Sequence, residues 1–204
     1  MIQTYFITGI STEVGKTVVS AIITQALQAD YWKPIQAGDL DNTDSHKVEK
    51  WVTNPKTVFH KSAFNLKTPM SPHAAAAIDR VDISVKNIKR PKSKNNLVIE
   101  GAGGLLVPIN EKETIADLIE PNDKVIVISK HYLGSINHTL LTIQALKQRN
   151  LTISGIIFNG TEHPTTEAII ASKTGVPILG RIDEEPYINE HVISEYGEIF
   201  KEKL

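Results

Sequence analysis

The sequence predicts a doubly wound α/β fold, in which helices cover both faces of a mostly parallel sheet. Short β-branched runs alternate with helical patterns along most of the 204 residues. The runs Val125 to Ile128 and Gly155 to Phe158 show no polar alternation, as expected for strands that are covered on both faces. The chain length fits one domain, which we expect to span residues 1–204.

Each expected element is a short stretch with its own periodicity. Apolar, β-branched runs predict strands at residues 4–8, 31–33, 97–100, 124–129, 153–159 and 176–179, and Gly180 is expected to begin a loop. Helical patterns fill the gaps at residues 16–29, 135–149, 165–174 and 189–203. The helix at 135–149 is expected to bury Ile136, Leu140, Leu141, Ile143 and Leu146.

The stretch from Gln36 to Asn96 is the least regular part of the chain. Between Lys86 and Lys94 it is locally basic, which we interpret as a solvated helix end and loop rather than a binding patch. We assign no function to this basic segment.

Composition excludes several classes of function. The chain has 22 Lys and Arg against 23 Asp and Glu, so no overall basic field favours nucleic acid or an anionic membrane. It has no cysteine, which excludes disulfides, thiolate metal sites and cysteine nucleophiles. The start of the chain does not resemble a secretory signal, and no apolar run reaches the roughly 18 residues of a membrane span, so we expect a soluble, cytoplasmic protein. The seven histidines are scattered and form no metal-binding pattern.

The strongest motif is Gly9-Ile-Ser-Thr-Glu-Val-Gly-Lys-Thr17, which follows the first expected strand and opens the first expected helix. Backbone N–H groups of such a loop surround polyphosphate oxygens, Lys16 neutralises them, and the Thr17 hydroxyl can bind Mg²⁺. The first Gly lies one residue earlier than in the usual pattern, so the loop is a variant. A chance Gly-Lys-Thr in a plain strand-turn-helix is the alternative. The motif predicts a P-loop NTPase-like fold that binds ATP.

Three further residues carry charge that suits the same site. Glu100 begins Glu-Gly-Ala-Gly-Gly104 at the end of a strand, where it can face the Mg²⁺ of a P-loop. Lys33 ends a short strand and would bring a second ammonium to the phosphates if that strand lies beside the first. Its alternative is a surface lysine. Asp44 could equally be a helix N-cap or a Mg²⁺ ligand.

A longer series of motifs resembles one family across nearly the whole chain. The series consists of Tyr5-Phe-Ile-Thr-Gly-Ile-Ser-Thr-Glu-Val-Gly-Lys-Thr17, Lys33-Pro34 with Gly38, Thr43-Asp44, Ser71-Pro-His73, Glu100-Gly-Ala-Gly-Gly104, Leu133-Gly-Ser-Ile-Asn-His138, Asn159 and Pro177-Ile-Leu-Gly180. In these segments and in their order, the chain resembles the dethiobiotin synthetase family.

The resemblance implies an ATP- and Mg²⁺-dependent cyclo-ligase of biotin biosynthesis. In that family CO₂ forms a carbamate on one amine of 7,8-diaminononanoate, ATP phosphorylates it to a mixed anhydride, and the second amine displaces phosphate to give dethiobiotin. The resemblance also implies a homodimer with the diamine at the subunit interface. The absence of a protein nucleophile agrees with direct phosphoryl transfer to a bound anion.

Site roles are carried over from the family residue by residue. The resemblance assigns catalysis to Thr12, Lys16 and Lys33, and Mg²⁺ to Thr17, Asp44 and Glu100. It assigns the nucleotide to Glu13, Val14, Gly15, Lys16, Thr17, Asp44, Glu100, Gly101, Ala102, Gly103, Asn159, Gly160 and Glu190. It assigns the diamine and its carboxylate to Thr12, Lys33, Ala37, Gly103, Leu133, Gly134, Ser135 and Asn137, the last four from the other subunit.

Two departures and two rival interpretations stay open. The family commonly has a hydroxyl residue at the position of Ala37, and Asp183 to Glu185 replace an apolar turn. A corrin-type amidoligase of the same class usually carries a glutaminase part with a Cys, which this chain lacks. A partition-type ATPase switch typically has a second Lys early in its loop, and Gly9 to Glu13 contains none.

Overall fold

The computed structural model describes residues 2–204, which contain nine strands, six α-helices and three short 3₁₀ helices. The strands are β1 (Thr4–Gly9), β2 (Asp30–Trp32), β3 (Ile35–Ala37), β4 (Phe59–His60), β5 (Phe64–Leu66), β6 (Leu97–Gly104), β7 (Lys124–Lys130), β8 (Thr152–Asn159) and β9 (Ile178–Ile182). The helices are α1 (Lys16–Leu27), α2 (Asp44–Trp51), α3 (Pro72–Asp79), α4 (Ser135–Gln148), α5 (Pro164–Thr174) and α6 (Glu190–Lys201). The 3₁₀ helices are η1 (Leu40–Asn42), η2 (Val85–Asn87) and η3 (Ile115–Leu118).

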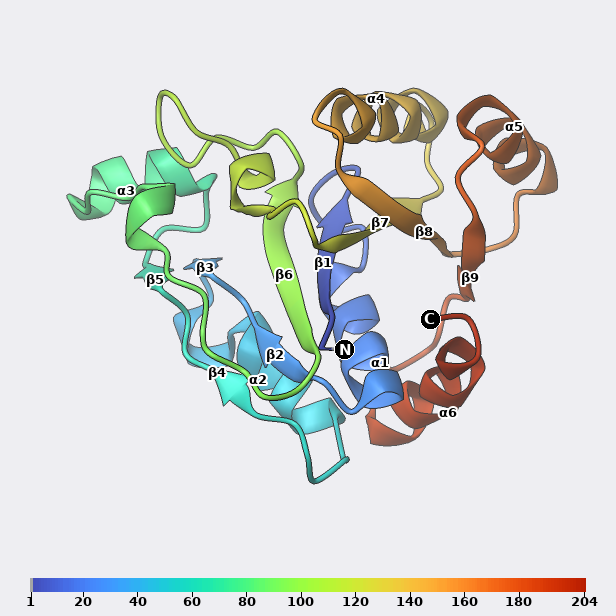
Figure 1. Ribbon diagram of the computed structural model, residues 1–204, viewed down its shortest axis with the longest axis horizontal. Coiled ribbons are helices and arrows are strands. Elements are labelled where there is room, and N and C mark those ends of the chain that lie inside the picture. Colours follow the sequence, from blue (N-terminus) through green and yellow to red (C-terminus); the bar gives the residue numbers. More distant parts are fainter. Residues whose placement is uncertain (1) are drawn as a thin grey trace.

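Seven strands form one sheet in the order β4-β2-β6-β1-β7-β8-β9, and each neighbouring pair is parallel. The strands β3 and β5 form a separate parallel pair. Figure 1 shows α4 and α5 on one side of the sheet and α1 and α6 on the other. This arrangement confirms the doubly wound α/β fold. The chain goes from β1 to β2 on one side of β1 and later crosses from β6 to β7 on its other side, so the strand order reverses at β1.

The core lies on both faces of the central strands. Phe6, Ile7, Val98, Ile126 and Ile157 are all fully buried, as the continuous apolar runs predicted. Fourteen-residue α4 and the other crossover helices supply the covering layers. Among residues 2–204, no helix combines the length and the apolar character that crossing a membrane requires.

Two expected strand ends are wrong. Residues 101–104 were expected to form a glycine-rich turn, but they continue β6 to Gly104, which pairs with Gly9 of β1. Gly180 was expected to begin a loop, but it lies inside β9. A Cβ at Gly180 would lie 3.1 Å from the ring of Phe200, so glycine here permits α6 to pack against the strand.

The expected buried face of α4 is also partly wrong. Ile136 is 37% exposed and Leu141 is 55% exposed, whereas Thr139 is fully buried. The Thr139 hydroxyl lies 2.8 Å from the Ser129 hydroxyl and donates to the Ser135 carbonyl, so polar partners permit its burial. Apolar spacing alone could not reveal that a hydroxyl pair faces the sheet.

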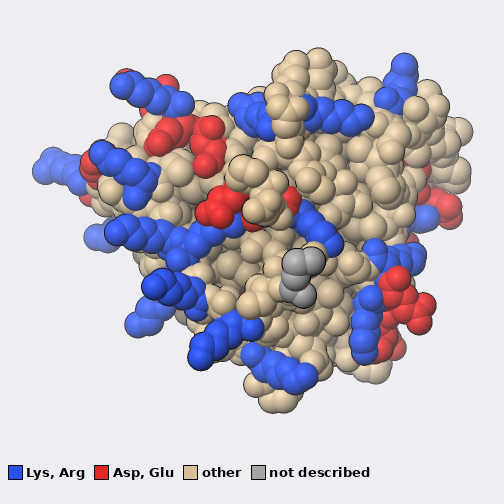
Figure 2. All heavy atoms as spheres, in the orientation of Figure 1, with Lys and Arg blue, Asp and Glu red and all other residues tan. Residues whose placement is uncertain are grey.

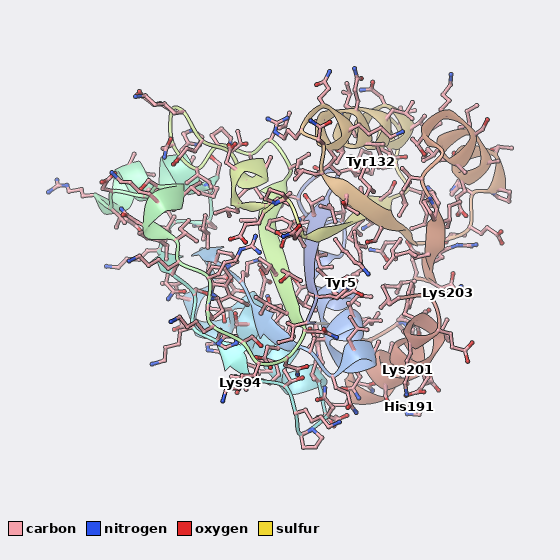
Figure 3. All side chains as sticks on the ribbon, in the orientation of Figure 1. Tyr5, Lys94, Tyr132, His191, Lys201 and Lys203 are labelled. Carbon is pink, nitrogen blue, oxygen red and sulfur yellow. The ribbon has the colours of Figure 1, made fainter. Side chains whose placement is uncertain are left out.

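The irregular stretch from Gln36 to Asn96 contains more structure than the sequence indicated. It forms β3, β4, β5, α2 and α3. Within its basic segment, Arg90 is half-buried and not fully solvated. Its guanidinium donates to both carboxylate oxygens of buried Asp123, at 2.7 and 2.5 Å, and to the Leu118 carbonyl. Figure 3 places Lys94 at the margin of the molecule, near β4, and Figure 2 shows further basic side chains along that margin.

Candidate active site

The carboxyl ends of β1, β2 and β6 meet at a cavity of about 720 Å³. Parallel sheets bind ligands at this edge because loops and helix N-termini converge there. The structure brings eleven of the predicted site residues to the cavity wall. They are Thr12, Glu13, Gly15, Lys16, Thr17, Lys33, Ala37, Asp44, Glu100, Ala102 and Gly103.

The loop between β1 and α1 has the backbone of a phosphate-binding loop. Glu13 and Gly15 adopt positive φ angles of 57° and 95°, so successive N–H groups turn toward one side. Asn159 at the end of β8 donates from Nδ2 to the Val14 carbonyl at 2.9 Å. A Cβ at Gly15 would collide with that amide, which explains the glycine. Lys16 folds over the loop and donates to the Ser11 carbonyl at 3.1 Å.

Lys33 lies between two carboxylates. Its Nζ is 2.6 Å from Asp44 Oδ2 and 2.9 Å from Glu100 Oε1. The same Glu100 oxygen accepts a hydrogen bond of 3.0 Å from the Thr17 hydroxyl. The expected role of Lys33 was conditional on its strand lying beside the first, and β2 lies beside β6 instead. The register pairs Trp32 with Ile99, so the next residues along, Lys33 and Glu100, face each other.

These ion pairs shift pKa values in opposite directions. Burial alone would lower the pKa of Lys33, but the charges of Glu100 and Asp44 outweigh it and raise the pKa. Burial would raise the pKa of Asp44, yet the Lys33 ammonium and a smaller contribution from Lys47 lower it. Lys33 is therefore a permanent cation at neutral pH and not a base.

Lys16 behaves differently from Lys33. Its pKa is lowered to about 8: burial lowers it most, the Glu100 charge partly compensates, the Lys33 charge lowers it, and the Asp44 charge raises it. Among the residues that the structure describes, no carboxylate lies within ion-pair distance of Lys16. A polyphosphate would supply the negative charge that this buried ammonium needs.

Asp44 was expected either as a helix N-cap or as a metal ligand, and the structure rules out the first. The N-cap of α2 is Thr43, whose hydroxyl accepts from the His46 N–H at 3.1 Å. Asp44 is the first residue of α2 and directs its carboxylate at Lys33.

The oxygen atoms of Thr17, Asp44 and Glu100 fit a Mg²⁺ ion. All three are hard donors, and they converge through the Thr17 to Glu100 hydrogen bond and the shared Lys33 ammonium. In residues 2–204 no group of three or more His, Asp or Glu side chains could hold a metal by itself. Two carboxylates and a hydroxyl are nevertheless what a Mg²⁺ site completed by phosphate oxygens and water contains.

Glycines in the last part of β6 allow neighbouring segments to pack closely around the end of this strand. A Cβ at Gly101 would lie 3.2 Å from Ile115 and Phe6 side-chain carbons, and Gly103 has a φ of 70° beside Thr12. Gly101 therefore lets β6 pack against β1 and η3, and Gly103 permits a positive φ beside Thr12 of the phosphate-binding loop.

Several predicted site residues lie outside the cavity. Leu133, Gly134 and Asn137 are exposed, and Ser135 is buried at the start of α4. Figure 3 shows the neighbouring Tyr132 at the α4 side of the molecule. Glu190 is exposed at the first turn of α6, and Gly160 follows Asn159 beside a separate hollow that contains Glu184.

Sequence reasoning missed several contributors to the site, among them Lys47, Val107, Met70 and Tyr31. Lys47 lines the cavity one turn after Asp44, a helical spacing that could have revealed it. Val107 and Met70 line an apolar part of the wall, and no sequence pattern indicates them.

Tyr31 lies below the cavity and donates to Glu100 Oε2 at 2.8 Å. Alternation along β2 places Tyr31 on the same face as Lys33 and could have indicated it. Burial and the Glu100 charge raise the pKa of Tyr31 well above its ordinary value.

Solved structures share the fold but little sequence. A cell division ATPase MinD of Pyrococcus furiosus aligns with a TM-score of 0.61 at 15% identity and covers 100% of this chain and 98% of its own. A ParA family ATPase of Chlorobium tepidum gives a TM-score of 0.60 at 14% identity, with 98% and 92% covered. At such identities the likeness shows the fold alone.

Sequence relatives are much closer. A family model described as an AAA domain (AAA_26) matches residues 3–192. An ATP-dependent dethiobiotin synthetase BioD of Christiangramia forsetii is 64% identical over 204 residues, covering 100% of this chain and 99% of the relative. The synthetase of the same name from Cytophaga hutchinsonii is 49% identical over 195 residues, with 95% and 94% covered. With identity this high over the full length, the chain belongs to the ATP-dependent dethiobiotin synthetase family.

Proposed function

We propose that this cavity closes the ureido ring of dethiobiotin from 7,8-diaminononanoate, CO₂ and ATP. The observation that carries the proposal is the position of Lys33, which is held as a cation between Glu100 and Asp44 in the same cavity as the phosphate-binding Lys16. Two ammonium groups suit a reaction in which one anion, a carbamate, attacks another, the γ-phosphate of ATP.

The steps follow from this placement. One amine of the substrate adds to CO₂ and loses a proton, giving a carbamate. A carbamate oxygen attacks the γ-phosphorus, and the bond to the bridging oxygen breaks to release ADP. The second amine then attacks the carbamoyl carbon, loses its proton, and phosphate leaves as the ring closes.

The roles of the residues are electrostatic and orienting. Lys16 and the loop N–H groups of Glu13 to Thr17 hold the phosphates, and Thr12 with Lys33 orients the carbamate. Thr17, Asp44 and Glu100 would hold Mg²⁺, which when bound neutralises charge on the phosphates. Ala37, Val107 and Met70 offer apolar contacts for the aliphatic chain of the diamine. The missing hydroxyl at Ala37 suits that apolar wall.

Adenine and ribose contacts are proposed for Asn159, Gly160 and Glu190. Support is strongest for Asn159, because its amide touches the phosphate-binding loop. Glu190 is exposed and has no contact to this loop in the structure, so its role depends on the resemblance alone. We place the reaction in the cytoplasm, where ATP is supplied.

A homodimer would complete the site. Leu133 is 104% exposed, and Tyr132 and Ile136 beside it are also exposed, so the start of α4 presents apolar side chains that a second copy could cover. The N-terminus of α4, with Gly134, Ser135 and Asn137, would then offer N–H groups to the substrate carboxylate of the partner.

The test is product formation by the purified protein with ATP, Mg²⁺ and bicarbonate, with and without the diamine. We expect phosphate release that depends on the diamine, with dethiobiotin detected in step by mass spectrometry.

Lys33→Met should lower kcat at least about 100-fold because it removes charge from the transfer site. The exposed Lys173→Met of α5 serves as the matched control and should behave as wild type.

Lys33→Met should also lower stability, since it leaves the buried Glu100 and the half-buried Asp44 without their cation. Its folded fraction is therefore checked by thermal unfolding before rates are compared. Phosphate release that does not depend on the diamine, or that DNA or a protein stimulates, would contradict the proposal and favour an ATPase switch.

A further inference from the structure

Tyr31 lies directly beneath the proposed metal site without taking part in the cavity wall. It is fully buried on β2, which is the neighbour of β6 in Figure 1. Its hydroxyl donates to Glu100 Oε2 at 2.8 Å, and Glu100 itself is 1% exposed. The Ser45 hydroxyl also approaches the Tyr31 hydroxyl, whose acceptor is Glu100.

The two oxygens of Glu100 are thereby given different partners. Oε1 faces the cavity, where the Thr17 hydroxyl and the Lys33 ammonium donate to it. Oε2 faces the interior, where the Tyr31 hydroxyl donates to it. A carboxylate with a donor on each oxygen cannot rotate without losing a hydrogen bond in a buried setting.

The Tyr31 hydroxyl is not needed for packing, because the ring alone makes the apolar contacts. The Tyr31 ring packs near Phe59, with centroids 6.3 Å apart, and phenylalanine would fill the same volume. What phenylalanine would lack is the donor to Oε2. Lys33 would then be the only strong donor near that carboxylate apart from Thr17.

We propose that Tyr31 is a positioning residue, which holds Oε2 of Glu100 in the interior so that Oε1 stays directed at Thr17 and the metal. The inference rests on the proposed Mg²⁺ site. Partners that orient a metal-binding carboxylate commonly change metal affinity by about 10- to 100-fold when removed. Tyr31 acts through Glu100 and touches neither nucleotide nor diamine.

The test compares Tyr31→Phe with Tyr5→Phe. Tyr5 is also a buried strand tyrosine, but its hydroxyl bonds the Leu204 carbonyl at 3.4 Å, away from the cavity. Figure 3 shows Tyr5 on β1. Mn²⁺ is titrated into each protein with ADP, and free Mn²⁺ is followed by electron paramagnetic resonance.

We expect Tyr31→Phe to weaken Mn²⁺ binding about tenfold or more, while Tyr5→Phe binds like wild type. The ADP affinity measured in EDTA should change less than about twofold in both variants, which separates metal positioning from damage to the fold. In turnover, Tyr31→Phe should lower kcat and leave the KM for the diamine unchanged.

Equal Mn²⁺ affinity in wild type and folded Tyr31→Phe would overturn the inference, and so would a wild-type protein that binds no Mn²⁺ with ADP. A Tyr31→Phe protein with a lower KM for the diamine and an unchanged metal affinity would likewise overturn it. Failure of the proposed reaction would appear separately, as a wild-type protein that binds Mn²⁺ and ADP but forms no dethiobiotin.

Discussion

Two buried lysines with opposite pKa shifts define the chemistry at the residue scale. Lys33 is surrounded by acids that raise its pKa, whereas burial lowers the pKa of Lys16 to about 8. The difference follows from their neighbours, since Lys33 forms two ion pairs and Lys16 donates to a neutral carbonyl. The Lys33 charge is thus neutralised by side chains of the protein, whereas the Lys16 charge has only a neutral carbonyl as its hydrogen-bond partner.

This difference predicts a pH dependence of ATP binding. Phosphate raises the pKa of Lys16 above its free value of about 8, so binding above that pH requires uptake of a proton. The Kd for ATP should be constant below pH 8 and then rise about tenfold per pH unit. Calorimetry in two buffers of different ionisation enthalpy measures both the Kd and the proton uptake. A constant Kd up to pH 9.5, without proton uptake, would show that Lys16 stays charged.

Lys16→Met tests the same buried charge through stability. A lysine with a lowered folded-state pKa destabilises the protein below that pKa, and stability rises as pH increases toward the unfolded value of 10.5. Removing the charge should therefore stabilise the nucleotide-free protein at pH 7, by about 2 kcal/mol, and abolish ATP binding. Chemical denaturation without nucleotide measures the gain. A loss of stability instead would mean that the hydrogen bond to Ser11 outweighs the burial of charge.

At the scale of elements, α2 determines where Asp44 lies. Thr43 caps the helix by accepting from the His46 N–H, and the His46 ring accepts from the Thr43 N–H at 3.3 Å. Lys47, one turn further, lies 2.9 Å from Asp39 and so ties the helix to the preceding loop. The cap therefore sets the position of a carboxylate that lies one residue after it.

Thr43→Ala should lower stability by about 1 kcal/mol, because an N–H at the helix start loses its acceptor. It should also raise the Mg²⁺ concentration needed for half-maximal activity, since Asp44 follows directly. Thr43→Ser keeps the oxygen and should restore both properties. Urea denaturation and a Mg²⁺ titration of product formation provide the two readings. A Thr43→Ala protein with normal stability and normal Mg²⁺ requirement would show that the cap does not hold Asp44.

At the scale of the whole molecule, one face of the start of α4 remains apolar and exposed. Leu133→Asp should convert the proposed dimer to monomers in analytical ultracentrifugation, because it places a charge in the interface. Product formation should fall more than about tenfold, while ATP binding should persist since the phosphate-binding loop belongs to one chain.

The matched control for this substitution is Ile199→Asp, at a residue of α6 that is 54% exposed on the other side of the sheet. It should leave both the sedimentation and the activity unchanged. A Leu133→Asp protein that remains dimeric and fully active would place the interface elsewhere.

Sequence patterns determined those features that depend on neighbouring residues. The continuous apolar runs predicted the central strands, because strands covered on both faces need no polar alternation. The stretch from Gly9 to Thr17 predicted the phosphate-binding loop, because its strand, loop and helix are contiguous. A helical period does not say which polar residues have buried partners, so the buried face of α4 was partly misjudged at Ile136 and Leu141.

Only the tertiary structure decided how the site is joined. Thr17 and Glu100 are 83 residues apart, and Tyr31 and Glu100 are 69 residues apart. Their contacts depend on β2 pairing with β6 rather than with β1, and on the register that sets Lys33 opposite Glu100. Strand order results from packing of the whole sheet and its crossover helices, and no local pattern encodes it. The sequence by itself therefore determined which charged and hydroxyl residues could serve a phosphate site, while the folded sheet decided which of them lie within hydrogen-bond or ion-pair distance of one another.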